Sequence, residues 1–364
     1  MGSFKQRNFE SGHHDLINDV AFDFYGRRLA TCSSDHTVKV WDQNEQGQWQ
    51  CTCTWRAHSG AVWKVTWAHP EFGQVLATCS FDRTAAVWEE IVSDASSDHH
   101  QTTWIRRAPL VDWRTSISDV RFSPRCMGLQ LATVSADGVI RIYEAMDVMN
   151  LSTWSLEHEL NMRCAGSCIS WSPAPSFLSQ LLAAGSEEPP NATNPHTGGA
   201  KVLVFEYSKS ARKWSKVQNL TAITDKVHDI AFAPNMGRSF HVLGIASSAV
   251  QIVALTPPAD GSGPLEVREL ARLEDHRSVV WRVAWSITGT ILGSSGDDGC
   301  VRLWKANYLN HWKCVCKLLA DSGSSASSRD GEKSAAGSVS ATALSTAKYY
   351  KMGAIKHPNE VAWH

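Results

Sequence analysis

A unit that recurs six times along this 364-residue chain limits the folds that it can adopt. Each copy contains a β-branched residue, a small or polar residue and an aromatic residue in succession, the pattern of a half-buried strand. The six copies are Val20-Ala21-Phe22, Val65-Thr66-Trp67, Val120-Arg121-Phe122, Ile169-Ser170-Trp171, Ile230-Ala231-Phe232 and Val283-Ala284-Trp285. The aromatic residues of successive copies are 45 to 61 residues apart, and self-similarity at such a spacing predicts a repeat architecture in which each copy is one supersecondary unit.

Each unit carries signals for four short strands. The aromatic residue of each copy is called its first anchor. An apolar segment that ends in a turn follows this anchor, as in Leu29–Asp35 and Leu76–Asp82, and leads to a second large residue, the second anchor. The six second anchors are Trp41, Trp88, Tyr143, Phe205, Val253 and Trp304. A fourth strand often opens with tryptophan, at Trp49, Trp104, Trp154, Trp214 and Trp312. Four short strands per unit predict an all-β, six-bladed propeller.

The best-formed units carry a histidine, an aspartate and a tryptophan at fixed spacing. The histidine stands nine residues before the first anchor, and the aspartate stands six residues before the second. Together with Gly12-His13 and Trp41-Asp42, this pattern resembles the WD40 repeat family. The resemblance implies a structural hydrogen-bond network made of His13, Asp35, Trp41, His58, Asp82, Trp88, His276, Asp298 and Trp304. Unit 3 keeps Asp137 but lacks the histidine, and units 4 and 5 are degenerate.

We expect three segments: an N-terminal extension (1–11), the propeller (12–319) and a low-complexity, flexible tail (320–364). Residues 320–347 consist mostly of Ser, Ala and Gly, and such a segment buries too little surface to order itself. Two insertions, Ile91–Gln101 and Glu187–Gly199, are rich in polar and turn-forming residues and are expected to be surface loops.

The two ends of the repeat predict a ring that stays open. The sixth unit has its own fourth strand at Trp312–Leu319, and the few residues before the first unit cannot form another blade. The first and sixth blades should therefore meet at a seam without a covalent or strand-swapped clasp. Exposed strand edges normally need protection, so such a seam is a candidate binding site.

Composition and motifs disfavour other function classes. The 35 Lys and Arg residues balance 36 Asp and Glu residues, so we expect no direct binding of nucleic acid. No apolar stretch is long enough to insert into a membrane, and ten cysteines in a chain without an apolar signal core are expected to be reduced. The pairs Cys51-x-Cys53 and Cys314-x-Cys316 lack the usual zinc-ligand spacing.

Catalytic motifs are also missing from the sequence. It contains no G-x-S-x-G elbow, P-loop or H-E-x-x-H motif. The Ser, His and Asp residues of each unit could suggest a catalytic triad, but they recur in several units together with a tryptophan, which favours a structural network. We therefore expect a protein that is not an enzyme and needs no cofactor and no metal.

Four longer segments carry a more specific resemblance. Phe72–Ala77, Cys79–Glu90, Phe232–His241 and Ser295–Tyr308 resemble the SEH-type nucleoporins, and the similarity extends over all six units. The resemblance implies an open propeller in the Y-shaped scaffold complex of the nuclear pore, at the nuclear envelope. It implies that an α-helical partner nucleoporin donates a seventh blade between blades 1 and 6. It also implies a second membership, in a lysosomal complex that regulates amino-acid signalling through the TOR pathway.

The innermost strands of blades 1 and 6, expected at Ile17–Phe22 and Val279–Trp285, would accept the donated blade. In such β-augmentation, main-chain hydrogen bonds supply general affinity and side chains supply selectivity. The candidate partner-binding residues are Phe22, Trp281 and Trp285, unless they pack against their own neighbouring blades. Two other function classes remain open: a vesicle coat propeller of the related SEC type, and an enzyme that uses the central channel.

Overall fold

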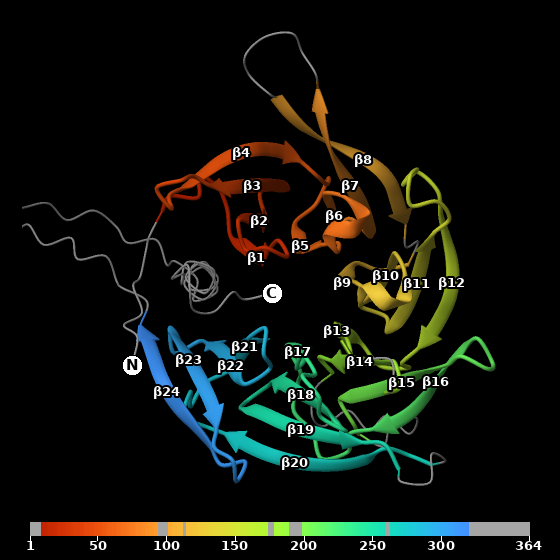
Figure 1. The fold of residues 1–364 in the computed structure, drawn as a ribbon, viewed down its shortest axis with the longest axis vertical. Coiled ribbons are helices and arrows are strands. Elements are labelled where there is room, and N and C mark those ends of the chain that lie inside the picture. Colours follow the sequence, from red (N-terminus) through yellow and green to blue (C-terminus); the bar gives the residue numbers. More distant parts are fainter. Residues whose placement is uncertain are drawn as a thin grey trace, which may run out of the picture.

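The computed structural model describes residues 9–93, 101–111, 114–173, 178–188, 199–258 and 263–319. These residues form six four-stranded antiparallel sheets arranged around a common axis like the blades of a propeller (Figure 1). The predicted six-bladed, all-β propeller is therefore confirmed. The predicted tail, 320–364, and residues 1–8 of the N-terminal extension lie outside the described residues.

The blades follow one another along the chain, and each uses four consecutive strands. Blade 1 contains β1 (Ile17–Phe22), β2 (Arg28–Ser33), β3 (Thr37–Gln43) and β4 (Trp49–Arg56), and blade 2 contains β5 (Val62–Trp67), β6 (Val75–Ser80), β7 (Thr84–Ser93) and β8 (Gln101–Val111). Blade 3 contains β9 (Ile117–Phe122), β10 (Gln130–Ser135), β11 (Val139–Ala145) and β12 (Trp154–Asn161), and blade 4 contains β13 (Gly166–Trp171), β14 (Leu181–Ser186), β15 (Val202–Ser208) and β16 (Lys213–Asn219). Blade 5 contains β17 (Asp229–Phe232), β18 (His241–Ala246), β19 (Val250–Thr256) and β20 (Glu266–Leu273), and blade 6 contains β21 (Val280–Trp285), β22 (Ile291–Gly296), β23 (Cys300–Ala306) and β24 (Trp312–Leu319). Short 3₁₀ turns, η1 (Pro70–Phe72) and η2 (Arg125–Met127), follow the first strands of blades 2 and 3.

The register of the strands explains the spacing of the aromatic anchors. Within each blade, the first strand lies nearest the axis and the fourth forms the outer rim (Figure 1). In blade 1, Leu29 of β2 pairs with Phe22 of β1 on one side and with Trp41 of β3 on the other. Leu76 makes the same two pairings in blade 2. The two anchors of each unit are therefore neighbours across the same central strand.

The turn between the second and third strands explains the aspartate of the repeat. Asp35 accepts a hydrogen bond from the backbone N–H two residues later, at 2.9 Å, and His36 between them adopts a φ of 71°. Arg83 holds the equivalent place in blade 2, with a φ of 69°. In blade 3 the place is taken by Gly138, where a Cβ atom would lie only 1.8 Å from the carbonyl oxygen of Cys164. A side chain at that glycine would force the two turns apart.

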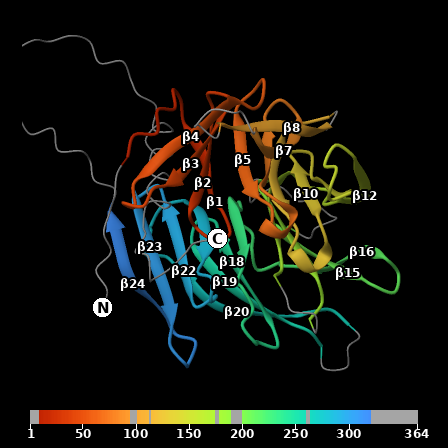
Figure 2. The ribbon, with the colours of Figure 1, turned by 45° about the horizontal axis from the view of Figure 1, so that its top comes forward.

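The hydrophobic core is divided among the junctions between blades. Five clusters of buried side chains each join two consecutive blades, from the junction of blades 1 and 2 to that of blades 5 and 6. Within the described ranges, no such cluster joins blade 6 to blade 1. The predicted seam without a strand-swapped clasp is therefore present in the described residues, and in Figure 1 the ribbons of blade 1 (red) and blade 6 (blue) stand apart on the left. Figure 2 shows β22, β23 and β24 side by side, with β24 at the edge of the sheet.

The first expected insertion loop is shorter than predicted. β7 continues to Ser93 and β8 begins at Gln101, and Ile91 of β7 pairs with Thr103 of β8. The β-branched pair Ile91-Val92 favours extended structure and so prolongs the hairpin. Residues 94–100, and 189–198 of the second insertion, lie outside the described residues. At the seam, β21 begins one residue later than expected, at Val280.

Candidate interaction site at the seam between blades 1 and 6

The structure brings together the histidine, aspartate and tryptophan of each well-formed unit. In blade 1, His13 Nδ1 lies 3.0 Å from Asp35 Oδ2, and His13 Nε2 lies 2.9 Å from the hydroxyl of Thr31. Trp41 donates its indole N–H to the same hydroxyl, at 3.1 Å. The equivalent sets in the other two blades are His58, Asp82, Thr78 and Trp88, and His276, Asp298, Ser294 and Trp304. The bridging hydroxyls were not predicted, although each stands ten residues before its tryptophan.

These networks are structural in character. The three bridging hydroxyl residues are all fully buried, and each hydroxyl is already shared by a histidine and a tryptophan. Burial lowers the pKa of His13 and favours the neutral ring. Burial alone would raise the pKa of Asp35, but hydrogen bonds from Thr37 and from the backbone N–H of His14 hold it well below its ordinary value. A buried hydroxyl that is already bonded on both sides is what a structural hydrogen-bond network requires.

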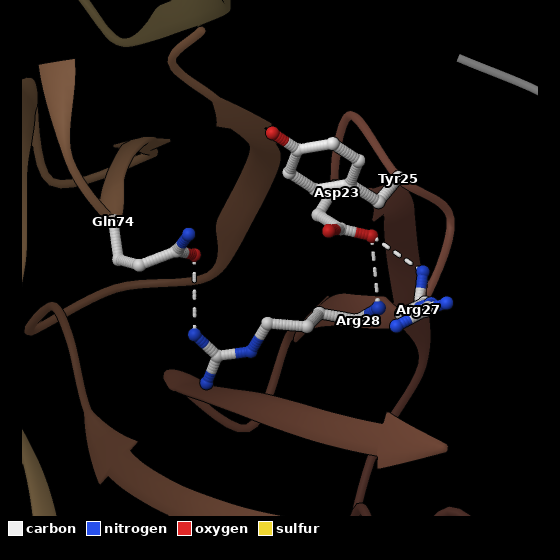
Figure 3. Close-up of a pocket in the computed structure, with 5 residues that line it drawn as sticks. All are labelled: Asp23, Tyr25, Arg27, Arg28 and Gln74. Atoms are coloured by element: carbon white, nitrogen blue, oxygen red, sulfur yellow. Dashed lines mark hydrogen bonds between the residues drawn. The ribbon is translucent and has the colours of Figure 1, made fainter. Parts of the chain in front are cut away.

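A shallow depression of about 620 Å³ lies between blades 1 and 2 and is lined by Asp23, Tyr25, Arg27, Arg28 and Gln74 (Figure 3). Its polar groups hold the two blades together. Arg28 of blade 1 donates to Gln74 Oε1 of blade 2 at 3.1 Å and pairs with Glu90 of blade 2. Asp23 Oδ1 accepts the backbone N–H groups of Arg27 and Arg28, at 2.7 and 2.8 Å. The charges of Asp23 and Arg28 are thus engaged within the protein.

The wall of the seam formed by blade 1 lacks the cover that other blades have. Val20 of β1 is partly exposed, whereas its equivalents in the other five blades are at most 5% exposed. Those equivalents are Val65, Val120, Ile169, Ile230 and Val283. Trp49 at the start of β4 is also partly exposed, and its ring centroid lies 5.8 Å from that of Phe22. Phe9 packs edge-on against Trp41, at 5.0 Å, and covers part of this aromatic wall.

Blade 6 forms the opposite wall of the seam. Leu303 of β23 pairs with Cys316 of β24, in the register that Val40 and Cys53 have in blade 1. Val40 and Cys53 pack against the following blade, blade 2. Leu303 and Cys316 therefore lie on the face of blade 6 where a following blade would pack; Leu303 is 2% exposed, whereas Cys316 and Leu318 are partly exposed. Both walls of the seam are mainly apolar.

The predicted partner-binding residues do not all lie on these walls. Phe22 borders the seam, but Trp285 is 2% exposed and donates its indole N–H to the carbonyl oxygen of Ala231 in blade 5, at 2.9 Å. The ring of Trp281 lies 4.4 Å from the ring of His228, also in blade 5. Side chains alternate between the two faces of a strand, and this face of β21 is turned toward blade 5. The two tryptophans thus pack against a neighbouring blade, the alternative weighed above.

Between these two tryptophans, Arg282 reaches across the seam. Its Nη2 donates to the carbonyl oxygen of Asn18 at 3.2 Å, and its Nε lies 3.9 Å from Asp19 Oδ1. This contact was not predicted. The sequence does contain a signal for it, because a charged residue recurs at the third position of several innermost strands.

Several chemical properties of the described residues bear on function. Among them, no group of three or more His, Cys, Asp or Glu side chains could hold a metal ion. All ten cysteines are free, and burial raises the pKa of Cys314 and Cys316, which disfavours the reactive thiolate. No helix in this part of the chain has the length and apolar character needed to span a membrane.

Comparison with known proteins gives a consistent result. The family described as "WD domain, G-beta repeat" matches residues 4–42, 49–89 and 267–305, which include most of blade 1, β5, β6 and part of β7 in blade 2, β20 of blade 5, and β21 to β23 of blade 6. Nucleoporin SEH1 of Homo sapiens is 54% identical over 321 residues, which cover 86% of this chain and 88% of that protein. Nucleoporin SEH1 of Danio rerio is 54% identical over 344 residues, which cover 92% and 93%. Nucleoporin SEH1-A of Xenopus laevis is 54% identical over 326 residues, which cover 87% and 89%.

Proposed function

Because the chain belongs to the nucleoporin SEH1 family, we propose that it is a non-catalytic scaffold subunit of the Y-shaped complex of the nuclear pore. In this role its open seam accepts a seventh blade from an α-helical partner nucleoporin. The observation that carries the proposal is the missing junction: five junctions have a buried core, and the described residues of the sixth do not. Partly exposed apolar side chains on both walls, such as Val20, Trp49 and Leu318, favour a partner that covers them.

The donated blade would be held mainly by side-chain packing. All strand pairing in the described residues lies within single blades, and neighbouring blades contact each other through their faces. We therefore expect the contribution of main-chain pairing to be smaller than β-augmentation suggests. Val20, Phe22 and Trp49 would contact the donated blade directly. Trp281 and Trp285 would contribute indirectly, because their contacts with blade 5 hold β21 in place.

The test is capture of partners from nuclear extract with the full chain. We expect a stoichiometric α-helical nucleoporin with a strand-forming segment, and we expect Val20→Asp to release it because a carboxylate would be buried against an apolar blade. Val92→Asp, at a 54% exposed position on blade 2, is the matched control and should keep the partner. Recovery of the chain without a partner, or equal capture by Val20→Asp, would overturn the proposal.

We also propose a second membership, in a lysosomal complex of the TOR pathway, so that the chain serves both nucleocytoplasmic transport and amino-acid signalling. The support is the SEH-type resemblance of all six blades. Localisation of endogenously tagged protein tests it: signal at the nuclear rim and at the cytoplasmic face of lysosomes is expected. Co-purification with vesicle coat subunits instead of nucleoporins would favour the SEC-type alternative.

A further inference from the structure

The innermost strands of the propeller carry an alternating set of residues at one level of the ring. At the position immediately before each repeat motif, the six blades place Asp19, Lys64, Asp119, Cys168, Asp229 and Arg282. Blades 1, 3 and 5 contribute an aspartate, and blades 2 and 6 contribute a cation. These side chains are largely buried: Lys64 is 4% exposed, Asp119 0% and Asp229 3%. A buried charge is costly unless it has a partner, so these side chains constrain how neighbouring blades pack against each other.

Each aspartate binds the blade that follows it. The backbone N–H groups of Val65, Ile169 and Val283 donate to Asp19, Asp119 and Asp229, at 3.3, 3.0 and 3.1 Å. A tryptophan returns the contact: Trp67, Trp171 and Trp285 donate to carbonyl oxygens of the preceding blade, at 3.0, 3.1 and 2.9 Å. These reciprocal bonds couple the blades as three pairs, 1 with 2, 3 with 4, and 5 with 6. The seam therefore falls between two pairs and interrupts none of these bonds.

Arg282 joins the last pair to the first. Its hydrogen bond to the Asn18 carbonyl oxygen and its approach to Asp19 cross the seam on the innermost strands, β21 and β1. Asp19 is approached from the other side by Lys64 of blade 2, whose Nζ lies 4.0 Å away. Farther from the axis, the same seam leaves Trp49 and Leu318 partly exposed. The seam is thus bridged on the innermost strands, while Trp49 of β4 and Leu318 of β24 on its outer strands are partly exposed.

We propose that Arg282 is the positioning residue that pins blade 6 to blade 1 at the axis and thereby sets the width of the opening for the seventh blade. This inference rests on the function proposed above. With Arg282 bound to blade 1, blades 5 and 6 cannot move away from blade 1 together. The distance between the two apolar walls is then fixed before the partner binds. The donated blade enters from the rim. Without the pin, the walls must be brought into register when the partner binds, and that ordering lowers affinity.

The test compares Arg282→Met with Lys64→Met in the full chain. Each substitution removes one cation next to Asp19, but only the arginine crosses the seam, so Lys64→Met is the matched control. In the free chain, we expect amide hydrogen exchange of β21 to rise about tenfold in Arg282→Met and to stay near the wild-type rate in Lys64→Met. We expect the affinity for the captured helical partner to fall about tenfold in Arg282→Met and less than about twofold in the control.

The outcomes separate the two proposals. If wild-type chain captures no partner, the proposed function fails, while hydrogen exchange of the free chain still decides the role of Arg282. If Arg282→Met leaves both exchange and affinity unchanged, or binds the partner more tightly, Arg282 is not the pin. Arg282→Lys keeps the charge on a shorter side chain and covers the case in which the methionine variant does not fold; loss of affinity without loss of folding is expected there too.

Discussion

The junction of blades 1 and 2 and the seam between blades 6 and 1 use equivalent positions with opposite results. At the closed junction, Trp104 is 6% exposed and stacks on Trp55 of blade 1, with ring centroids 5.5 Å apart and an interplanar angle of 11°. Trp49 occupies the same place in blade 1, on the side of the seam, and is partly exposed. The residue type is the same, so the difference comes from the presence or absence of a preceding blade.

The polar contacts of the two junctions differ in the same way. Arg28 links blade 1 to Glu90 of blade 2 far from the axis, and Trp67 donates to the Ala21 carbonyl oxygen, at 3.0 Å. At the seam, the contacts described are those of Arg282, on the innermost strands. The comparison shows that every blade has one face suited to pack against the preceding blade and one suited to pack against the following blade. Whether both faces are covered depends on whether both neighbouring blades are present.

The largest expected effect is on stability at the closed junction. Trp104→Ala should lower the free energy of unfolding by about 3–5 kcal/mol, because it removes a buried aromatic side chain and leaves a cavity. Trp49→Ala should cost less than about half as much, because this side chain is already partly exposed. Urea unfolding of both variants provides the measurement. Equal losses would mean that the seam is covered in the free chain.

A smaller effect should be the same on both sides. Thr78→Val and Thr31→Val each remove a fully buried hydroxyl that a histidine and a tryptophan share, one at the closed junction and one beside the seam. Each should cost about 1–3 kcal/mol, because the polar partners lose their hydrogen bonds in a buried place. A much smaller loss for Thr31→Val would show that water reaches the network of blade 1. Thermal unfolding at neutral pH is sufficient for this comparison.

The pH dependence of stability should be the mildest of these effects. Burial alone would raise the pKa of Asp82, but hydrogen bonds from His58 and Thr84 lower it below its ordinary value, as Thr37 and His14 do for Asp35. A lowered pKa in the folded state means that stability is present above the unfolded value of about 3.9 and is lost as the pH falls below it. Urea midpoints should therefore decrease from about pH 5 downward.

Asp82→Asn should be less stable at pH 7 and should show a flatter dependence in this acid range. A slope unchanged by the substitution would contradict the role of this carboxylate. Asp137→Asn in blade 3 is a comparison variant, since that blade has the aspartate without the histidine.

Much of the fold could be predicted because the repeat carries its own register. The strand expected at Ile17–Phe22 is found with those bounds, and the anchors pair across the second strand as their spacing requires. The direction in which the Trp285 side chain points could not be predicted from the alternation of side chains alone. Alternation assigns side chains to two faces of a strand but does not say which neighbouring blade each face contacts. Arg282 was missed for a related reason: its partners, Asn18 and Asp19, lie at the other end of the propeller sequence.

The most direct test of the open seam is amide hydrogen exchange of the chain with and without its captured partner. We expect protection to appear together on both walls, in β1 and β4 of blade 1 and in β23 and β24 of blade 6, and to leave β9 to β12 of blade 3 unchanged. Protection of both walls by one partner would mean that a single segment fills the seam. Protection confined to one wall, or centred on another blade, would contradict it.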